Sequence, residues 1–143
     1  MNDEYNLQRF IGAQEAAYED AVYLLRQGMM CTSYMEFIFP RLAVRSGGPT
    51  PDPYAIGSLD EANAYLSFHP LGARYRECIG ILQRLYRVSP RAVFGEVDAK
   101  KLHASLTLFS EANPAEFLLE TMFEIWFDGL LDEDTMKEVV LMR

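Results

Sequence analysis

The chain has 143 residues, of which 50% are hydrophobic and 13% aromatic, and its formal net charge is −8. This size and composition predict one folded domain, 1–143, and argue against disorder, because disordered chains are poor in aromatic residues. The acidic charge argues against binding to nucleic acid or to an anionic membrane surface, since both need Lys and Arg side chains that face phosphates.

The N-terminal sequence and the cysteines favour the cytoplasm. Residues 1–5 have neither the basic nor the apolar region of a signal peptide. No apolar run approaches the roughly 18 residues of a transmembrane helix. Cys31 and Cys78 do not make a disulfide framework, so we expect two reduced, unlinked thiols.

The first predicted element is a helix over residues 7–25. Its apolar residues recur at helical spacing, although the length also allows two helices joined near Gln14. Gly28 is placed to end this helix in the left-handed conformation.

A short apolar segment and a loop follow. The segment 31–40 suits a buried helix that ends before Pro40, while its stretch 37–39 would equally suit a strand. We favour the helix, because the sequence shows no partner strand. Gly and Pro residues are concentrated over 43–58, which predicts one long loop.

Capping signals mark the helices of the second half. Ser58 and Glu61 form a capping box, and Ser89 precedes a proline at a first helical position. Gly95 is expected to close that short helix, and Asp98 and Asp132 to cap two later ones. The whole pattern predicts an all-α, compact bundle of about six to seven helices, with no sheet of three or more strands.

Motifs of known chemistry are weak in this sequence. The candidate metal ligands Cys31, Cys78, His69 and His103 show no ligand spacing, so we expect no metal and no cofactor. The glycine-rich stretch 46–50 lacks the Gly-Lys-Ser/Thr ending of a phosphate-binding loop. Lys101 and Ser105 lie one helical turn apart, as in a lysine-activated serine, but a solvated polar set has the same pattern.

Four acidic residues recur every fourth position: Glu116, Glu120, Glu124 and Asp128. Each like-charge pair at this spacing costs an isolated helix about 0.2–0.5 kcal/mol. Basic residues between 74 and 101 could offset that cost across the fold; solvation, a basic partner protein or a metal are the alternatives. We expect the other face of this helix to close the core with Phe117, Phe123 and Trp126.

Short pieces of the sequence follow the order and spacing of a known family. They include Leu7-Gln-Arg-Phe10, Phe37-Ile-Phe-Pro40, Tyr54-Ala-Ile56, Ala64-Tyr-Leu66, Phe94-Gly95, Asp98, Lys101-Leu102 and Thr107-Leu-Phe109. By these pieces the chain resembles the bacterial domain-of-unknown-function family 1810, sometimes labelled calpastatin-like. The resemblance spans nearly the whole chain and implies a mainly helical fold, without an established activity or cofactor.

The chain also departs from the family. Family members typically read Lys-Ser-His-Trp-Met-Trp where this chain has Cys31-Thr-Ser-Tyr-Met-Glu36, and paired serines where it has Ala104-Ser105. A family site built from that histidine and those serines would therefore be lost or altered here.

Two functions from different classes remain open. The favoured one is a non-catalytic binding or protein-interaction module for an unknown protein partner, with Glu116, Glu120, Glu124 and Asp128 as its interaction surface. The alternative is a small enzyme or small-anion binder with a polar cleft between segment 31–42 and a helix at 99–112. Lys101 would bind the anion, unless the Glu36 carboxylate pairs with Lys101 and blocks the site. The candidate residues of this cleft are Tyr34, Glu36, Arg41, Lys101, His103, Ser105 and Thr107.

Overall fold

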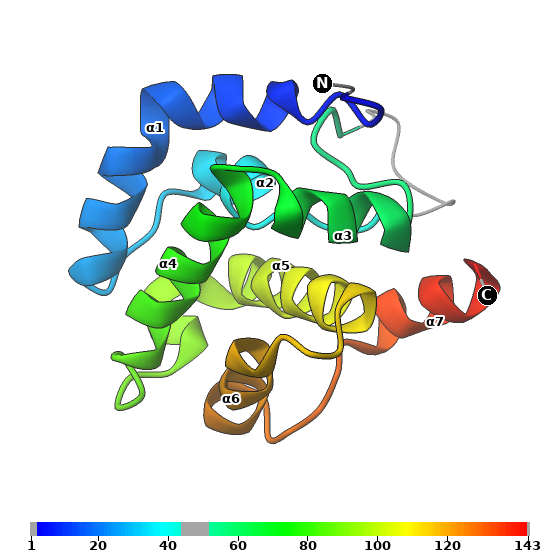
Figure 1. Cartoon of the computed structure of the whole chain (residues 1–143). Helices are drawn as coiled ribbons and strands as arrows, with labels where there is room; N and C mark the ends of the chain where they lie inside the picture. Colours follow the sequence, from blue (N-terminus) through cyan, green and yellow to red (C-terminus); the bar gives the residue numbers. More distant parts are fainter. Residues whose placement is uncertain (1–2, 44–51, 143) are drawn as a thin grey trace.

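The computed structural model describes residues 3–43 and 52–142, and helices dominate both ranges (Figure 1). In chain order the elements are α1 (Gln8–Arg26), η1 (Thr32–Tyr34), α2 (Met35–Ile38), α3 (Leu59–Ser67), α4 (Leu71–Gln83), α5 (Pro90–Ala112), α6 (Phe117–Trp126) and α7 (Glu133–Met142). The predicted all-α class is confirmed. The segment 31–40 is helical, as a 3-10 turn followed by α2.

Helix α5 lies at the centre of the arrangement (Figure 1). It contacts α2, α3, α6 and α7, while α4 contacts α1, α3 and α6. The other helices are thus held against α4 and α5.

Part of the predicted loop 43–58 lies outside the described residues, including the whole glycine-rich stretch 46–50. Its described part is closed by a parallel bridge between Leu42 and Ile56. The Ile56 amide donates to the Arg41 carbonyl, and the Ala43 amide donates to the Ile56 carbonyl, each at 2.8 Å. The bridge holds the residues after α2 beside those that precede α3.

Three of the predicted helix caps are present. The hydroxyl of Ser58 accepts the Glu61 amide at 3.0 Å, and that of Ser89 accepts the Ala92 amide at 3.1 Å. Asp132 accepts the amide three residues later at 3.0 Å. Each bond satisfies a helical N–H that has no partner within the helix.

The expected break at Gly95 is present. Gly95 has φ 78° and ψ 167°, which is not helical backbone, so it divides α5 into two helical segments that meet at a kink. Asp98 lies three residues beyond this kink, inside the second segment, and the expectation that it caps that helix is wrong. Its Oδ2 instead accepts a hydrogen bond from the Thr32 hydroxyl at 2.8 Å.

Aromatic rings connect four helices in the core. The rings of Tyr75 on α4 and Phe109 on α5 lie 4.5 Å apart between centroids. Tyr65 on α3 lies 5.3 Å from Phe109 and meets Phe10 of α1 edge-on at 5.0 Å. All four side chains are buried, so this cluster holds α1, α3, α4 and α5 together.

The aromatic face of α6 is only partly as expected. Trp126 and Phe123 are buried, and the Trp126 indole donates to the Val88 carbonyl at 3.0 Å. Phe117, however, is 71% exposed. Phe117 is the first residue of α6 and does not lie on the buried face, which Leu119, Met122, Phe123 and Trp126 form. The predicted burial of Phe117 is therefore wrong.

Candidate functional site

An alternating row of charges, the Glu36 network, joins α2 to α5 and consists of Asp52, Arg41, Glu36, Lys101 and Asp98. Glu36 accepts hydrogen bonds from Arg41 Nη2 at Oε2, 2.8 Å, and from Lys101 Nζ at Oε1, 2.9 Å. Arg41 lies 4.0 Å from Asp52, and Lys101 lies 3.6 Å from Asp98. Three of the candidate ligand residues, Glu36, Arg41 and Lys101, are thus brought together.

Two carboxyl groups of the network have shifted pKa values. Burial alone would raise the pKa of Glu36, but the hydrogen bonds from Lys101 and Arg41 outweigh it and hold that pKa below its usual value. The pKa of Asp52 is raised by burial and by the neighbouring charge of Glu36, although the Tyr54 amide opposes this. Glu36 is therefore ionised at neutral pH.

Asp98 is the buried end of the network. Its side chain is 5% exposed, and within the described part of the chain its Oδ1 has no hydrogen-bond partner. The Lys101 ammonium at 3.6 Å supplies the opposite charge that a buried carboxylate needs. The i, i+3 spacing of Asp98 and Lys101 was a signal in the sequence for this contact, whereas nothing there linked Asp98 to Thr32.

Ser105 and Thr107 face the interior, away from the Glu36 network. Both are fully buried. The Ser105 hydroxyl lies 2.9 Å from the Tyr75 hydroxyl of α4. The Thr107 hydroxyl donates to the carbonyl four residues earlier and accepts the Asp132 amide at 2.9 Å. The structure therefore uses both hydroxyls to join helices.

The other two candidate residues also have partners elsewhere. The His103 ring stacks on Phe127 with centroids 4.0 Å apart, and its Nε2 lies 2.7 Å from the Leu130 carbonyl. The Tyr34 hydroxyl donates to Asp20 of α1 at 2.7 Å, which raises the pKa of Tyr34. His103 thus supports the connection between α6 and α7, and Tyr34 fastens η1 to α1.

The four acidic residues near α6 do not form one surface. The guanidinium of Arg76 on α4 pairs with Glu116 through two nitrogens, the shorter contact being 2.8 Å. This is a match between α6 and the basic stretch, as one of the sequence interpretations held. Asp128 is exposed in the connection after α6, with φ 54°. Glu120 and Glu124 have no ion pair with any described cationic side chain.

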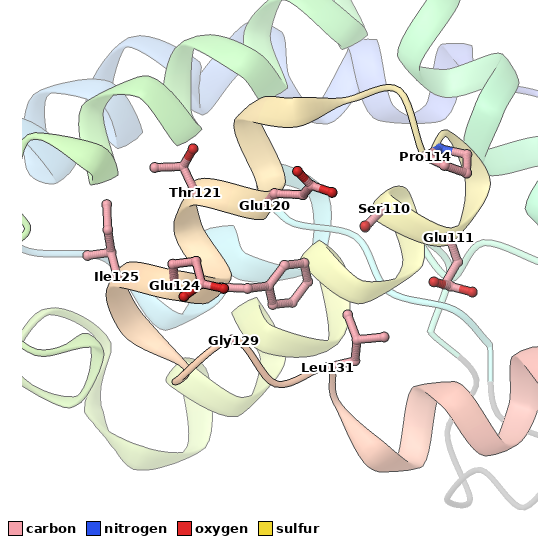
Figure 2. A pocket seen from close by; sticks show the side chains of 10 residues that line it. Ser110, Glu111, Pro114, Glu120, Thr121, Glu124, Ile125, Gly129 and Leu131 are labelled. Atoms are coloured by element: carbon pink, nitrogen blue, oxygen red, sulfur yellow. The ribbon is translucent and has the colours of Figure 1, made fainter.

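Glu120 and Glu124 line a hollow between α6 and the C-terminal end of α5, which we call the α6 hollow (Figure 2). Its volume is about 750 Å³. Glu120 extends from α6 towards Ser110 of α5, and Glu124 lies beside Gly129 (Figure 2). The remaining lining residues are Glu111, Pro114, Thr121, Phe123, Ile125 and Leu131. The lining is thus mixed, with acidic groups beside apolar side chains.

Sequence reasoning found the carboxylates of α6 but missed the residues opposite them. Ser110 and Glu111 belong to α5, and Leu131 belongs to the connection before α7. Their meeting with α6 depends on how the helices pack, for which the sequence carried no local signal.

The described residues contain neither a cluster of metal-binding side chains nor a helix that could span a membrane. Residues 3–43 and 52–142 contain no group of three or more His, Cys, Asp and Glu side chains that could hold a metal ion. Within the same ranges no helix combines the length and apolar character needed to cross a bilayer.

Comparisons with known proteins assign the family. The family model described as "Protein of unknown function (DUF1810)" matches residues 4–139. The chain belongs to DUF1810. Neither comparison that matches carries the label calpastatin-like, and no curated protein matches.

A solved DUF1810-like structure has the same fold. It is the crystal structure of the conserved hypothetical protein Rv1873 from Mycobacterium tuberculosis, which is 34% identical to this chain. The match covers 96% of this chain and 99% of that one, with a TM-score of 0.91.

Proposed function

We propose that this DUF1810 protein is a cytoplasmic, non-catalytic interaction module that binds a basic segment of a partner protein in the α6 hollow. The observation that carries the proposal is the pair Glu120 and Glu124, which line the hollow without a cationic partner among the described residues. Carboxylates beside apolar side chains suit a segment in which Lys or Arg alternates with apolar residues.

Exposed apolar residues on α6 and in the connection before α7, which also supply lining of the hollow, support the same proposal. Leu130 is 64% and Leu131 39% exposed, just before α7, and Phe117 is 71% exposed at the start of α6. Exposed apolar side chains on the same elements as acids that pair with no described cation favour a protein partner over a free cation, because a simple cation gains nothing from burying apolar surface.

An anion-binding enzyme is less well supported. The two cations near segment 31–42, Arg41 and Lys101, already pair with Glu36. Ser105 and Thr107, which would have completed a polar cleft, are buried and hydrogen-bonded to other helices.

The proposal is tested by NMR titration with a synthetic peptide of alternating Lys and Leu. We expect the amide signals of residues lining the α6 hollow to shift, and the affinity to fall with added salt. The double variant Glu120→Gln/Glu124→Gln should bind at least tenfold more weakly. A matched control, Glu19→Gln/Glu96→Gln, removes the same number of charges from exposed positions on α1 and α5.

The control variant should bind within about twofold of the parent protein, since those charges lie outside the hollow. Equal binding by both double variants, or shifts confined to residues away from the hollow, would overturn the proposal. A peptide of alternating Ser and Leu tests whether the contact depends on positive charge.

A further inference from the structure

In the Glu36 network one carboxylate bridges two cations from separate elements. One oxygen of Glu36 accepts from Lys101 at 2.9 Å, and the other accepts from Arg41 at 2.8 Å. The ammonium and the guanidinium are therefore spaced so that both can donate to a single oxyanion. Charge-assisted donors at such distances are typical of carboxylate and phosphate recognition.

Solvent can reach this pair of cations. The side chain of Arg41 is 33% exposed, that of Lys101 21% and that of Glu36 29%. The other carboxylates of the network lie farther from the two cations. Asp52 is 4.0 Å from the Arg41 guanidinium, and Asp98 is 3.6 Å from the Lys101 ammonium. Glu36 is thus the only described side chain that accepts hydrogen bonds from both cations.

We infer that Arg41 and Lys101 form an oxyanion-binding site that the Glu36 carboxylate occupies from within the chain, and that a phosphate or carboxylate group of a ligand binds there by displacing Glu36. This site is separate from the α6 hollow. Glu36 belongs to α2, so it can leave through rotation of its own side chain while the backbone of α2 stays in place.

Self-occupation makes the site autoinhibited. A tethered group competes at an effective concentration on the order of millimolar or higher, so an external anion binds only to the fraction of molecules that Glu36 has left. Removal of the Glu36 carboxylate should therefore uncover the affinity of the two cations for a free oxyanion.

The test is a thermal-shift titration with inorganic phosphate and, separately, with acetate, both at constant ionic strength. We expect Glu36→Ala to show a saturable rise in melting temperature, with an apparent affinity at least tenfold tighter than that of the parent protein. A response to phosphate alone would identify a phosphorylated ligand, and an equal response to acetate a carboxylate. The double variant Glu36→Ala/Lys101→Met should lose the response.

Glu116→Ala is the matched control. It removes a carboxylate that pairs with one described cation, Arg76, so its response to phosphate should be at least fivefold weaker than that of Glu36→Ala. If Glu36→Ala does not fold, Glu36→Gln replaces it, because an amide keeps the size of the side chain but loses the charge.

A folded Glu36 variant that responds no better than Glu116→Ala would overturn the inference. That result would mean that Lys101 turns to Asp98 once Glu36 is absent and that the two cations form no common site. Binding that survives Lys101→Met would overturn it as well.

Discussion

Gly72 shows how a single missing side chain permits the turn between α3 and α4. A Cβ atom at this position would lie 1.9 Å from the Leu66 carbonyl oxygen and 2.8 Å from Nη1 of Arg76. That Arg76 nitrogen itself donates to the Leu66 carbonyl at 3.1 Å. The two helices can therefore approach this closely only with glycine here.

We expect Gly72→Ala to lower the free energy of unfolding by about 3 kcal/mol or more, the upper end of overpacking costs, because the contact is with backbone. The control is Gly80→Ala on the same helix, where a Cβ would meet nothing within 4 Å. It should be neutral or stabilise by up to about 1 kcal/mol, since Ala favours a helix over Gly. Chemical denaturation measures both; equal stability of the two variants would contradict the close approach.

The two cysteines should differ in reactivity. Cys31 is exposed, and hydrogen bonding from Ser33 lowers the pKa of its thiol. Cys78 is buried, and burial raises the pKa of its thiol to about 12. Because the thiolate is the reactive form, we expect a disulfide reagent to modify Cys31 quickly in the native protein and Cys78 only after denaturation. Absence of free thiols in the denatured, unreduced protein would refute this prediction.

At the scale of elements, α6 has one buried face and one solvent-exposed face. Trp126→Ala should lower the free energy of unfolding by about 3–5 kcal/mol, because it empties a buried site between α6 and α5. Phe117→Ala on the same helix should change it by no more than about 0.5 kcal/mol, because that ring is 71% exposed. Urea denaturation compares them, and a loss below about 1 kcal/mol for Trp126→Ala would mean that the indole contributes little to the core.

One buried hydroxyl contributes to the link between α5 and α7. Thr107 of α5 accepts the amide of Asp132, and Asp132 in turn caps α7 through the Thr135 amide. Thr107→Val keeps the shape but leaves a buried N–H unpaired, which should cost about 1–3 kcal/mol. Hydrogen exchange at the Asp132 amide should accelerate in Thr107→Val and remain slow in Thr107→Ser, which retains the hydroxyl. Unchanged exchange in the valine variant would show that the bond is dispensable.

At the scale of the whole molecule, the shared core predicts one cooperative unfolding transition. Helices α1, α3, α4 and α5 meet in one aromatic cluster, and α6 joins it through contacts with α4 and α5. The single tryptophan, Trp126, reports on the α6 end of that core. Thermal unfolding followed by far-UV circular dichroism and by Trp126 fluorescence should therefore coincide. Two separated transitions would mean that the chain holds two independent units.

The sequence alone determined the helical class, most helix ends and the family resemblance. These features depend on local chemistry: apolar side chains at helical spacing, and the hydroxyls of Ser58 and Ser89 at the first turns. The break at Gly95 also followed from the sequence, because glycine readily adopts the positive φ that ends a helix.

Only the tertiary structure decided which candidate residues meet. Spacing along a helix suggested that Lys101, Ser105 and Thr107 share a cleft, but packing turned both hydroxyls inward and left Lys101 with Glu36. Helix packing also separated the acidic residues near α6. Glu116 forms an ion pair with Arg76, whereas Glu120 lines the α6 hollow. The physical reason is that a helix repeat fixes the direction of each side chain only relative to its own axis. The partner of that side chain depends on the helix that packs against it, and that helix can lie anywhere along the chain.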